Sequence, residues 1–125
     1  MSQVIAFANN QALSSKDGAD TTITTDPVPL NGYDRATAHL LVESIFNPLA
    51  GAGNGISYQG QVSNDGVNWL NVTALTDYAT ATTATPKAIT AAVNGAFLRF
   101  SYTLKAATSS VAGVTFDLHV LLDHV

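Results

Sequence analysis

The stretch FLRFSYTLK, Phe97 to Lys105, decides the fold class of this sequence. Every second residue in it is apolar, and the residues that follow them are polar or basic. The apolar positions are Leu98, Phe100, Tyr102 and Leu104. Successive side chains of a β-strand point to opposite faces, so this period of two predicts a strand with one buried face. No part of the chain carries the apolar stripe of an amphipathic helix.

The same alternation recurs elsewhere in the chain. It predicts strands over Val114 to Leu122 and Ala36 to Phe46, and more weakly over Val4 to Ala8 and Thr21 to Thr25. A short strand is also expected around Lys87 to Thr90. The inward side chains predicted for the two strong segments are Val114, Phe116, Leu118, Val120, Leu122, Ala36, Ala38, Leu40, Val42 and Phe46.

Two turn signals join these segments. The turn-rich AATSSVAG, residues 106–113, predicts that the last two strands form a hairpin. Two further stretches, Asn47 to Gly55 and Thr76 to Gly95, are expected to be long loops. With turns about every 8 to 12 residues, the pattern predicts about seven or eight strands. We therefore expect an all-β protein, a single antiparallel β-sandwich of the jelly-roll or Ig-like kind over residues 1–125.

The segment QVSNDGVNW, Gln61 to Trp69, contains the second turn signal. Asp65 and Gly66 predict a hairpin, because glycine tolerates the positive φ that tight turns need. A two-residue or a four-residue loop would place Trp69 on the same face as Gly60. We therefore expect Trp69 to be a core side chain that fills the gap over Gly60, with an exposed ligand platform as the alternative. Asp65, Gly66 and Trp69 form a structural signature in this interpretation.

Composition restricts the function. Only 11% of the residues are charged, against about 25% in typical proteins, while 46% are hydrophobic. Either much of the surface becomes an interface, or its polar faces are simply hydroxylic. Five scattered Lys and Arg residues and a net charge of −4 argue against a nucleic-acid groove. The absence of cysteine excludes disulfides, thiolate nucleophiles and zinc–thiolate sites. We expect no cofactor and no membrane partner, since no run approaches the roughly 20 apolar residues of a membrane helix.

Catalytic and metal-binding groups are scarce. Asp117, His119 and Asp123 share one face of the final predicted strand, where a solvated outer face is favoured over a metal site. Gly-x-Ser-x-Gly is absent, and Glu43 with scattered Asp residues does not form a defined carboxylate pair. The glycines from Gly51 to Gly55 lack the Lys-Ser/Thr of a phosphate-binding loop. The sequence therefore predicts no catalytic residues, no metal and no enzymatic activity.

Several apolar side chains are candidates for an oligomer or partner interface. Strand parity places some of them on outer faces, the N-terminal segment is apolar on both faces, and one lies in the glycine-rich loop. The candidates are Val4, Ile5, Phe7, Leu49, Leu70, Val72 and Leu121. Residues 1–9 would then be an N-terminal docking arm, or alternatively an ordinary buried edge strand.

Three stretches carry a family resemblance: LNGYDRAT (Leu30 to Thr37), QVSNDGVNW (Gln61 to Trp69) and FLRFSY (Phe97 to Tyr102). Together they resemble small β-sandwich virion proteins of tailed bacteriophages, namely head decoration (cement) proteins and related tail or adaptor components. The resemblance implies a non-enzymatic capsid protein that binds the major capsid protein or other virion proteins and stabilises the head. It further implies a homo-oligomer, often a trimer, located in the virion and assembled in the host cytoplasm.

Two alternatives stay open. The Ser-x-Asp-Gly-x-x-Trp element also occurs in carbohydrate-binding sandwiches, which would need two or more aromatic side chains aligned on one exposed face. Trp69, Tyr58 and Tyr102 are all predicted to point inward, which leaves Tyr33 and Tyr78 in loops. A tail or neck component of a virion with the same fold is the other alternative.

Overall fold

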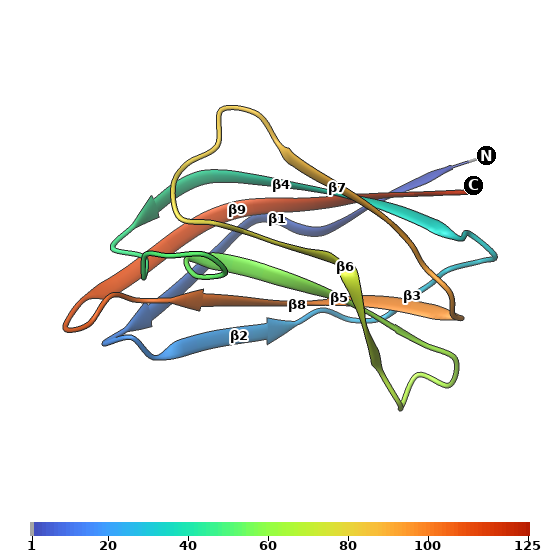
Figure 1. The fold of residues 1–125 in the computed structure, drawn as a ribbon, viewed down its shortest axis with the longest axis horizontal. Coiled ribbons are helices and arrows are strands. Elements are labelled where there is room, and N and C mark those ends of the chain that lie inside the picture. The colour runs from blue at the N-terminus through green and yellow to red at the C-terminus, as the bar shows by residue number, and fades with distance from the viewer. Residues whose placement is uncertain (1) are drawn as a thin grey trace.

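Two antiparallel β-sheets pack face to face in the computed structural model, which describes residues 2–125 (Figure 1). The strands in chain order are β1 (Gln3–Lys16), β2 (Asp20–Thr24), β3 (Val28–Pro29), β4 (Arg35–Phe46), β5 (Ile56–Ser63), β6 (Leu70–Ala79), β7 (Lys87–Ala92), β8 (Phe97–Lys105) and β9 (Val111–Asp123). The first sheet has the order β1-β9-β4-β7. The second has the order β2-β8-β5-β6, and β3 also pairs with β8. The predicted all-β sandwich is confirmed.

The strand order is that of a jelly roll. When the two-residue β3 is left aside, successive strands alternate between the two sheets, and only β5 and β6 are neighbours in one sheet. Eight strands in two four-stranded sheets with this order define the jelly roll. The sequence left jelly-roll and Ig-like orders open, because alternation reveals which face of a strand is buried and not which strand lies beside it.

The apolar alternation of β8 and β9 forms the centre of the core. All the inward positions predicted for these two strands are buried, including Phe100 and Phe116, which are fully enclosed. Tyr102 of the second sheet meets Phe116 of the first edge-to-face, with ring centroids 5.1 Å apart. Phe7 of β1 contacts Phe100 at 4.8 Å in the same way. These aromatic contacts across the sandwich hold the two sheets together.

The predicted hairpin between the last two strands is wrong. β8 pairs with β2 and β5 in the second sheet, while β9 pairs with β1 and β4 in the first. The segment 106–110 therefore crosses from one sheet to the other, as Figure 1 shows at the left end of the molecule. Each of the two strands has one apolar face. These faces are buried against each other across the core, because the strands lie in opposite sheets and not side by side in one sheet.

Phe46 is also not inward, as the alternation of β4 had suggested. The register with β9 shifts between Val42, which pairs with Phe116, and Ser44, which pairs with Thr115. This bulge adds one residue to β4 and reverses the faces of the residues that follow. Ile45 consequently packs against the core, and Phe46 is 56% exposed on the outer face.

The N-terminal segment is a strand of the first sheet. β1 pairs with β9 from Gln3 onward and contains two register shifts between Ala6 and Gln11. This agrees with the edge-strand alternative for residues 1–9, of which Met1 lies outside the described residues. The described chain contains no helix with the length and hydrophobicity that a membrane span requires. The predicted loop at Asn47 to Gly55 is present, with positive φ at Gly51, Gly53 and Gly55.

Candidate functional site

The hairpin between β5 and β6 is ordered by one carboxylate. Oδ1 of Asp65 accepts hydrogen bonds from the backbone N–H groups of Val67 and Asn68, both at 2.8 Å, and Oδ2 accepts one from Nδ2 of Asn68 at 2.7 Å. Ser63 Oγ lies 2.9 Å from the same carboxylate. These bonds, the backbone bond from Asn68 first, hold the pKa of Asp65 well below its usual value. Gly66 has a φ of 76°, the left-handed conformation expected for this turn.

Trp69 does not fill the core, contrary to expectation. Val62 pairs with Leu70, which is neither of the registers considered from the sequence, and Trp69 is only half-buried. The place over Gly60 is taken by Leu75, whose Cδ2 lies 2.5 Å from where a Cβ on Gly60 would be. Leu75 reaches it because β6 carries three more residues than β5 between the pairs on either side of Gly60. The missing side chain is thus compensated from the neighbouring strand.

Instead, Trp69 lies on the outer face of the second sheet beneath a cation. The guanidinium carbon of Arg99, in β8, is 4.1 Å from the centroid of the Trp69 ring. Arg99 Nε donates to Oε1 of Gln61 at 2.8 Å, and Gln61 Nε2 donates to Oδ1 of Asn71 at 2.9 Å. Arg99, Gln61 and Asn71 face one another in the register of β8, β5 and β6. We call these four residues the Trp69–Arg99 cluster.

Beside the hairpin the surface is hollowed. The hollow has a volume of about 280 Å³, and its walls include Ser63, Asp65, Leu70 and Asn94. Leu70 is 72% exposed at its rim, and Val67 at the hairpin tip is 78% exposed. The hairpin therefore presents apolar side chains, amide groups and a carboxylate together, a combination found in binding sites.

The predicted interface residues do not form one patch. Val4 pairs with Leu121 on the outer face of the first sheet, and Val4 is 67% exposed. Ile5, Phe7 and Val72 are partly buried and pack against the core. Val72 was expected to point outward, but the irregular pairing of β6 turns it inward. Leu70 is exposed on the hairpin, and Leu49 is half-buried in the loop after β4.

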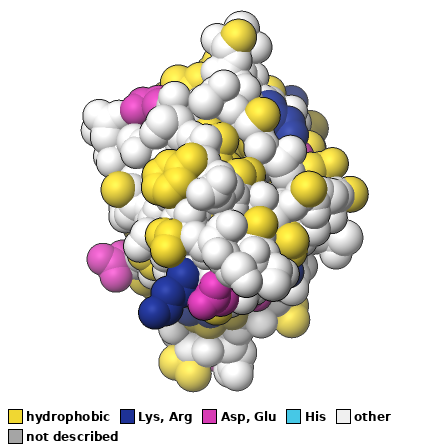
Figure 2. Space-filling model, turned by 90° about the vertical axis from the view of Figure 1, so that its left-hand side faces the viewer, with side chains coloured by type: hydrophobic (Ala, Val, Ile, Leu, Met, Phe, Trp, Pro, Cys, Tyr) yellow, Lys and Arg dark blue, Asp and Glu magenta, His cyan; other side chains and the backbone are white. Residues whose placement is uncertain are grey.

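An exposed apolar pair at the opposite end was missed. Phe46 pairs with Gly113 and lays its ring over that glycine, while Val111 is 54% exposed two residues earlier in β9. Asn47, the residue after Phe46, donates from Nδ2 to the carbonyl of Val111 at 3.2 Å and so links the two strands beside this pair. A glycine within a strand opposite an aromatic residue is the sequence signal that could have found it. Figure 2 shows this end of the molecule, where hydrophobic side chains lie scattered and only a few acidic and basic side chains are seen.

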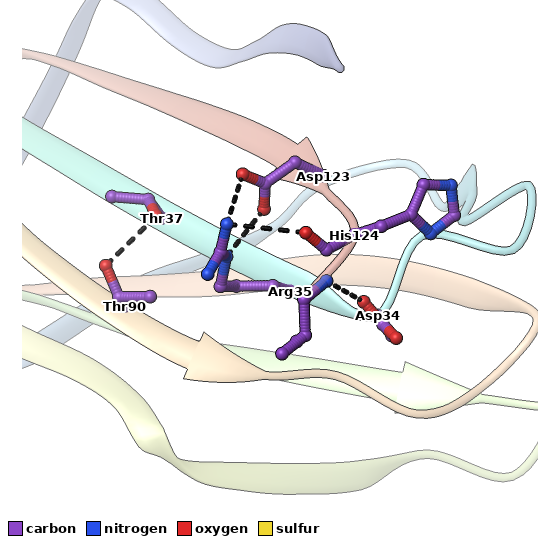
Figure 3. Close-up of polar contacts among 7 residues, drawn as sticks. Asp34, Arg35, Thr37, Thr90, Asp123 and His124 are labelled. Atoms are coloured by element: carbon purple, nitrogen blue, oxygen red, sulfur yellow. Dashed lines mark hydrogen bonds and ion pairs between the residues drawn. The ribbon is translucent and has the colours of Figure 1, made fainter. Parts of the chain in front are cut away.

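The polar side chains of β9 lie on the outer face of the first sheet, as expected. Asp123 receives two hydrogen bonds from Arg35, both 2.8 Å long, in a bidentate ion pair (Figure 3). This pair raises the pKa of Arg35 and lowers that of Asp123. Asp117 accepts a hydrogen bond from the backbone N–H of Asn10 at 2.6 Å. Its hydrogen bond with Glu43 raises the pKa of Glu43. Within residues 2–125 no three acidic or histidine side chains converge as a metal site would require.

The far end of the same sheet binds the last residues of the chain. Arg35 also donates to the carbonyl of His124 at 3.4 Å, and the backbone N–H of Val125 donates to Asp34 Oδ1 at 2.8 Å (Figure 3). The His124 ring lies against Tyr33, with centroids 5.0 Å apart. Arg35 and its neighbours are therefore occupied in holding the end of β9 and are not a free binding site.

No protein-family model and no curated protein sequence matches this chain. Solved structures match its fold. VP2 of infectious bursal disease virus, solved as a subviral particle, has a TM-score of 0.53 and 12% identity over 99% of this chain and 32% of VP2. A structure of the Gt strain of that virus has a TM-score of 0.51 and 12% identity, over 99% of this chain and 32% of the matched chain. The chain thus spans about a third of the VP2 chains that it matches.

A protein described as CpGH89CBM32-6 from Clostridium perfringens aligns with 94% of this chain and 91% of its own. Its identity to this chain is 14% and its TM-score 0.41, too low to define a shared fold. At 12% identity the likeness to VP2 establishes the β-sandwich fold and nothing about activity.

Proposed function

We propose that this protein is a non-enzymatic structural component of a virion, a decoration (cement) protein that stabilises the head of a tailed bacteriophage as a homo-oligomer. The observation that carries the proposal is the set of apolar side chains exposed on a surface with few charges. These side chains are between 54% and 78% exposed: Val4, Phe46, Val67, Leu70 and Val111. Large apolar groups exposed at several places mark contact surfaces for other proteins.

The exposed groups occupy three separate regions. Val4 lies on the outer face of the first sheet, Phe46 and Val111 lie at one end, and Val67 and Leu70 lie on the β5–β6 hairpin. A protein that joins several subunits of a shell needs contacts in several directions. Each contact can be weak, since linked sites raise the overall avidity by about 10² to 10⁴.

The rigid sandwich suits such a role. Its core residues are fully enclosed, and its loops and strand faces are free to carry contacts. VP2 of infectious bursal disease virus presents a related fold in a subviral particle, and a virion setting for this chain is consistent with that. Binding only to the assembled shell would stabilise the shell by mass action.

The proposal is tested on the virus that encodes the chain. Mass spectrometry of purified virions should detect it, and a cryo-EM map should place it on the outer surface of the head. Heads that lack the chain should break at a lower temperature and regain stability when purified protein is added. Absence of the chain from virions would refute a virion role, and a position on the tail or neck would replace decoration by the tail-component alternative.

Glycan binding is a second candidate, favoured by the outward position of Trp69. A carbohydrate-binding sandwich would need two or more aromatic side chains aligned on one exposed face, and this chain meets that requirement only in part. Tyr58 and Tyr102 are buried as predicted, and Tyr33 is buried too, whereas Tyr78 lies on the outer face by its pairing with Ser57. Arg99 covers the Trp69 ring, and Lys87 lies 4.9 Å over the Tyr78 ring. Retention on neutral polysaccharides that Trp69→Ala abolishes would favour this candidate over decoration.

A further inference from the structure

Arg99 is a cation held in place without a carboxylate partner. The described residues contain two ion pairs, Arg35–Asp123 and Lys87–Asp77, and neither involves Arg99. Its Nε donates to Gln61, while the terminal nitrogens Nη1 and Nη2 bind no group of residues 2–125. Lys16 and Lys105 also form no ion pair within the described residues, but Arg99 is in addition held by neighbouring side chains. Arg35 shows the geometry that Arg99 lacks, with both oxygens of Asp123 facing the guanidinium (Figure 3).

The surrounding residues fix the orientation of the guanidinium. The Trp69 ring supports one face of it at 4.1 Å, and the bond from Nε to Gln61 restricts rotation about the end of the side chain. Gln61 is itself anchored by its bond to Asn71. An arginine immobilised in this way loses little further freedom when it binds a ligand. Its four terminal N–H donors match the two oxygens of a carboxylate.

We propose that the Trp69–Arg99 cluster is a carboxylate-binding site for an aspartate or glutamate side chain of the shell subunit that the protein decorates. The Nη donors of Arg99 would bind the two carboxylate oxygens. The side-chain amide of Asn71 is exposed beside them, and its Nδ2 donates to no group of residues 2–125. Val67, exposed at the tip of the same hairpin, would contact apolar parts of the partner. The choice of a protein carboxylate rests on the proposed function, and the site itself does not.

A protein carboxylate fits this site better than an acidic sugar. A sugar ring binds an aromatic side chain by stacking on its open face. Here the guanidinium of Arg99 occupies a face of Trp69. The positive charge without a counter-ion supplies the complementarity that an acidic side chain requires.

The only tryptophan of the chain makes the site directly observable. We would titrate the protein with Ac-Leu-Glu-NH₂ at constant ionic strength and follow Trp69 fluorescence and the NMR signal of Arg99 Nε–H. Both signals should change saturably, while Ac-Leu-Gln-NH₂ should leave them unchanged. Arg99→Gln should weaken binding by about tenfold or more, the worth of a charge-assisted bidentate contact. The affinity of Arg99→Lys for the acidic peptide should lie between those of the unmodified protein and Arg99→Gln, because lysine keeps the charge and loses the forked donor geometry of the guanidinium.

Lys105→Gln is the matched control, since it removes the same charge from the same strand outside the cluster. It should bind the acidic peptide as the unmodified protein does. Equal responses to both peptides, no response in either signal, or an unchanged affinity in a folded Arg99→Gln variant would each overturn the site. Binding of D-glucuronate without binding of the acidic peptide would overturn the choice of a protein ligand.

Two further measurements separate this site from the proposed function. If Arg99→Gln dissociates the oligomer, the carboxylate comes from a second copy of the chain and the assignment to a shell subunit is wrong. The peptide titration needs no shell, so its failure leaves the decoration role standing. Conversely, a chain absent from virions that still binds the acidic peptide would retain the site and lose the proposed function.

Discussion

The guanidinium of Arg99 lies 4.1 Å from the ring centroid of Trp69 on the outer face of the second sheet. This contact, rather than a place in the core, accounts for the only tryptophan of the chain. Cation–π pairs at exposed sites contribute about 0.5–1 kcal/mol, much less than a buried aromatic side chain. Trp69 therefore belongs to the outer face of the second sheet, and the stability of the sandwich comes mainly from other residues.

Trp69→Ala should lower the free energy of unfolding by only about 1 kcal/mol, because mainly the stacking on Arg99 is lost. Leu75→Ala should cost about 2–5 kcal/mol, because Leu75 is fully buried and fills the space over Gly60. Denaturation by urea, followed by circular dichroism, measures both variants. The reverse ranking would return Trp69 to the core.

Oligomer formation should depend on the apolar end formed by Phe46 and Val111. Phe46→Ser combined with Val111→Ser should shift the protein toward the monomer in light scattering, since both side chains are more than half exposed. The double variant should keep the folded spectrum of the unmodified protein. Val67→Ser at the other end serves as control and should leave the oligomer intact. A monomeric unmodified protein at micromolar concentration would count against the whole oligomer proposal.

Deletion of residues 2–7 should destabilise the fold itself. Phe7 contacts Phe100, and Gln3 to Ala6 pair with β9, so the deletion removes core contacts as well as an outer face. A substitution that tests docking alone is Val4→Ser, which changes an exposed side chain. We expect Val4→Ser to retain the melting temperature and to weaken shell binding. A truncated protein that melts normally would show that the segment is a detachable arm after all.

Asp65 should contribute to stability only above acidic pH. Its folded-state pKa is depressed by hydrogen bonds from the hairpin backbone, so its contribution is present above the unfolded pKa of about 3.9. It is lost as pH falls below that value toward the folded pKa. Asp65→Asn should therefore be less stable than the unmodified protein at pH 7, and the difference should shrink as pH falls below about 4. Melting temperatures measured across this range give the comparison; a constant difference would mean that the carboxylate charge is irrelevant.

Glu43 should show the opposite dependence. Its pKa is raised by the hydrogen bond with Asp117, so its favourable contribution exists below the unfolded pKa of about 4.3 and is lost as pH rises through the folded pKa. Above that pH the two carboxylates repel each other. Glu43→Gln keeps a hydrogen-bond donor for Asp117. The variant should become more stable relative to the unmodified protein as pH rises from 4 to 7, because only the unmodified protein then acquires a second carboxylate charge. A flat difference between the two melting curves would contradict the pairing.

Local pattern predicted the faces of the regular strands. The inward sets of β8 and β9 are buried as expected, because alternation depends only on the geometry of the extended chain. The turn at Asp65 and Gly66 was also predictable, since it follows from the conformations that those two residue types tolerate. The arrangement of strands into sheets was not predictable in this way, and the expected hairpin between the last two strands was wrong.

The sequence by itself determined that the chain is an all-β sandwich, because period-two alternation requires each strand to bury one face against another sheet. Only the tertiary structure decided the jelly-roll order and the faces on which Phe46 and Trp69 lie. Both side chains follow an irregular pairing: an extra residue in β4 before Phe46, and a hairpin register that moves Trp69 outward. Such shifts reverse the face of every residue beyond them, and they are fixed by the fit between strands rather than by the strand's own residues.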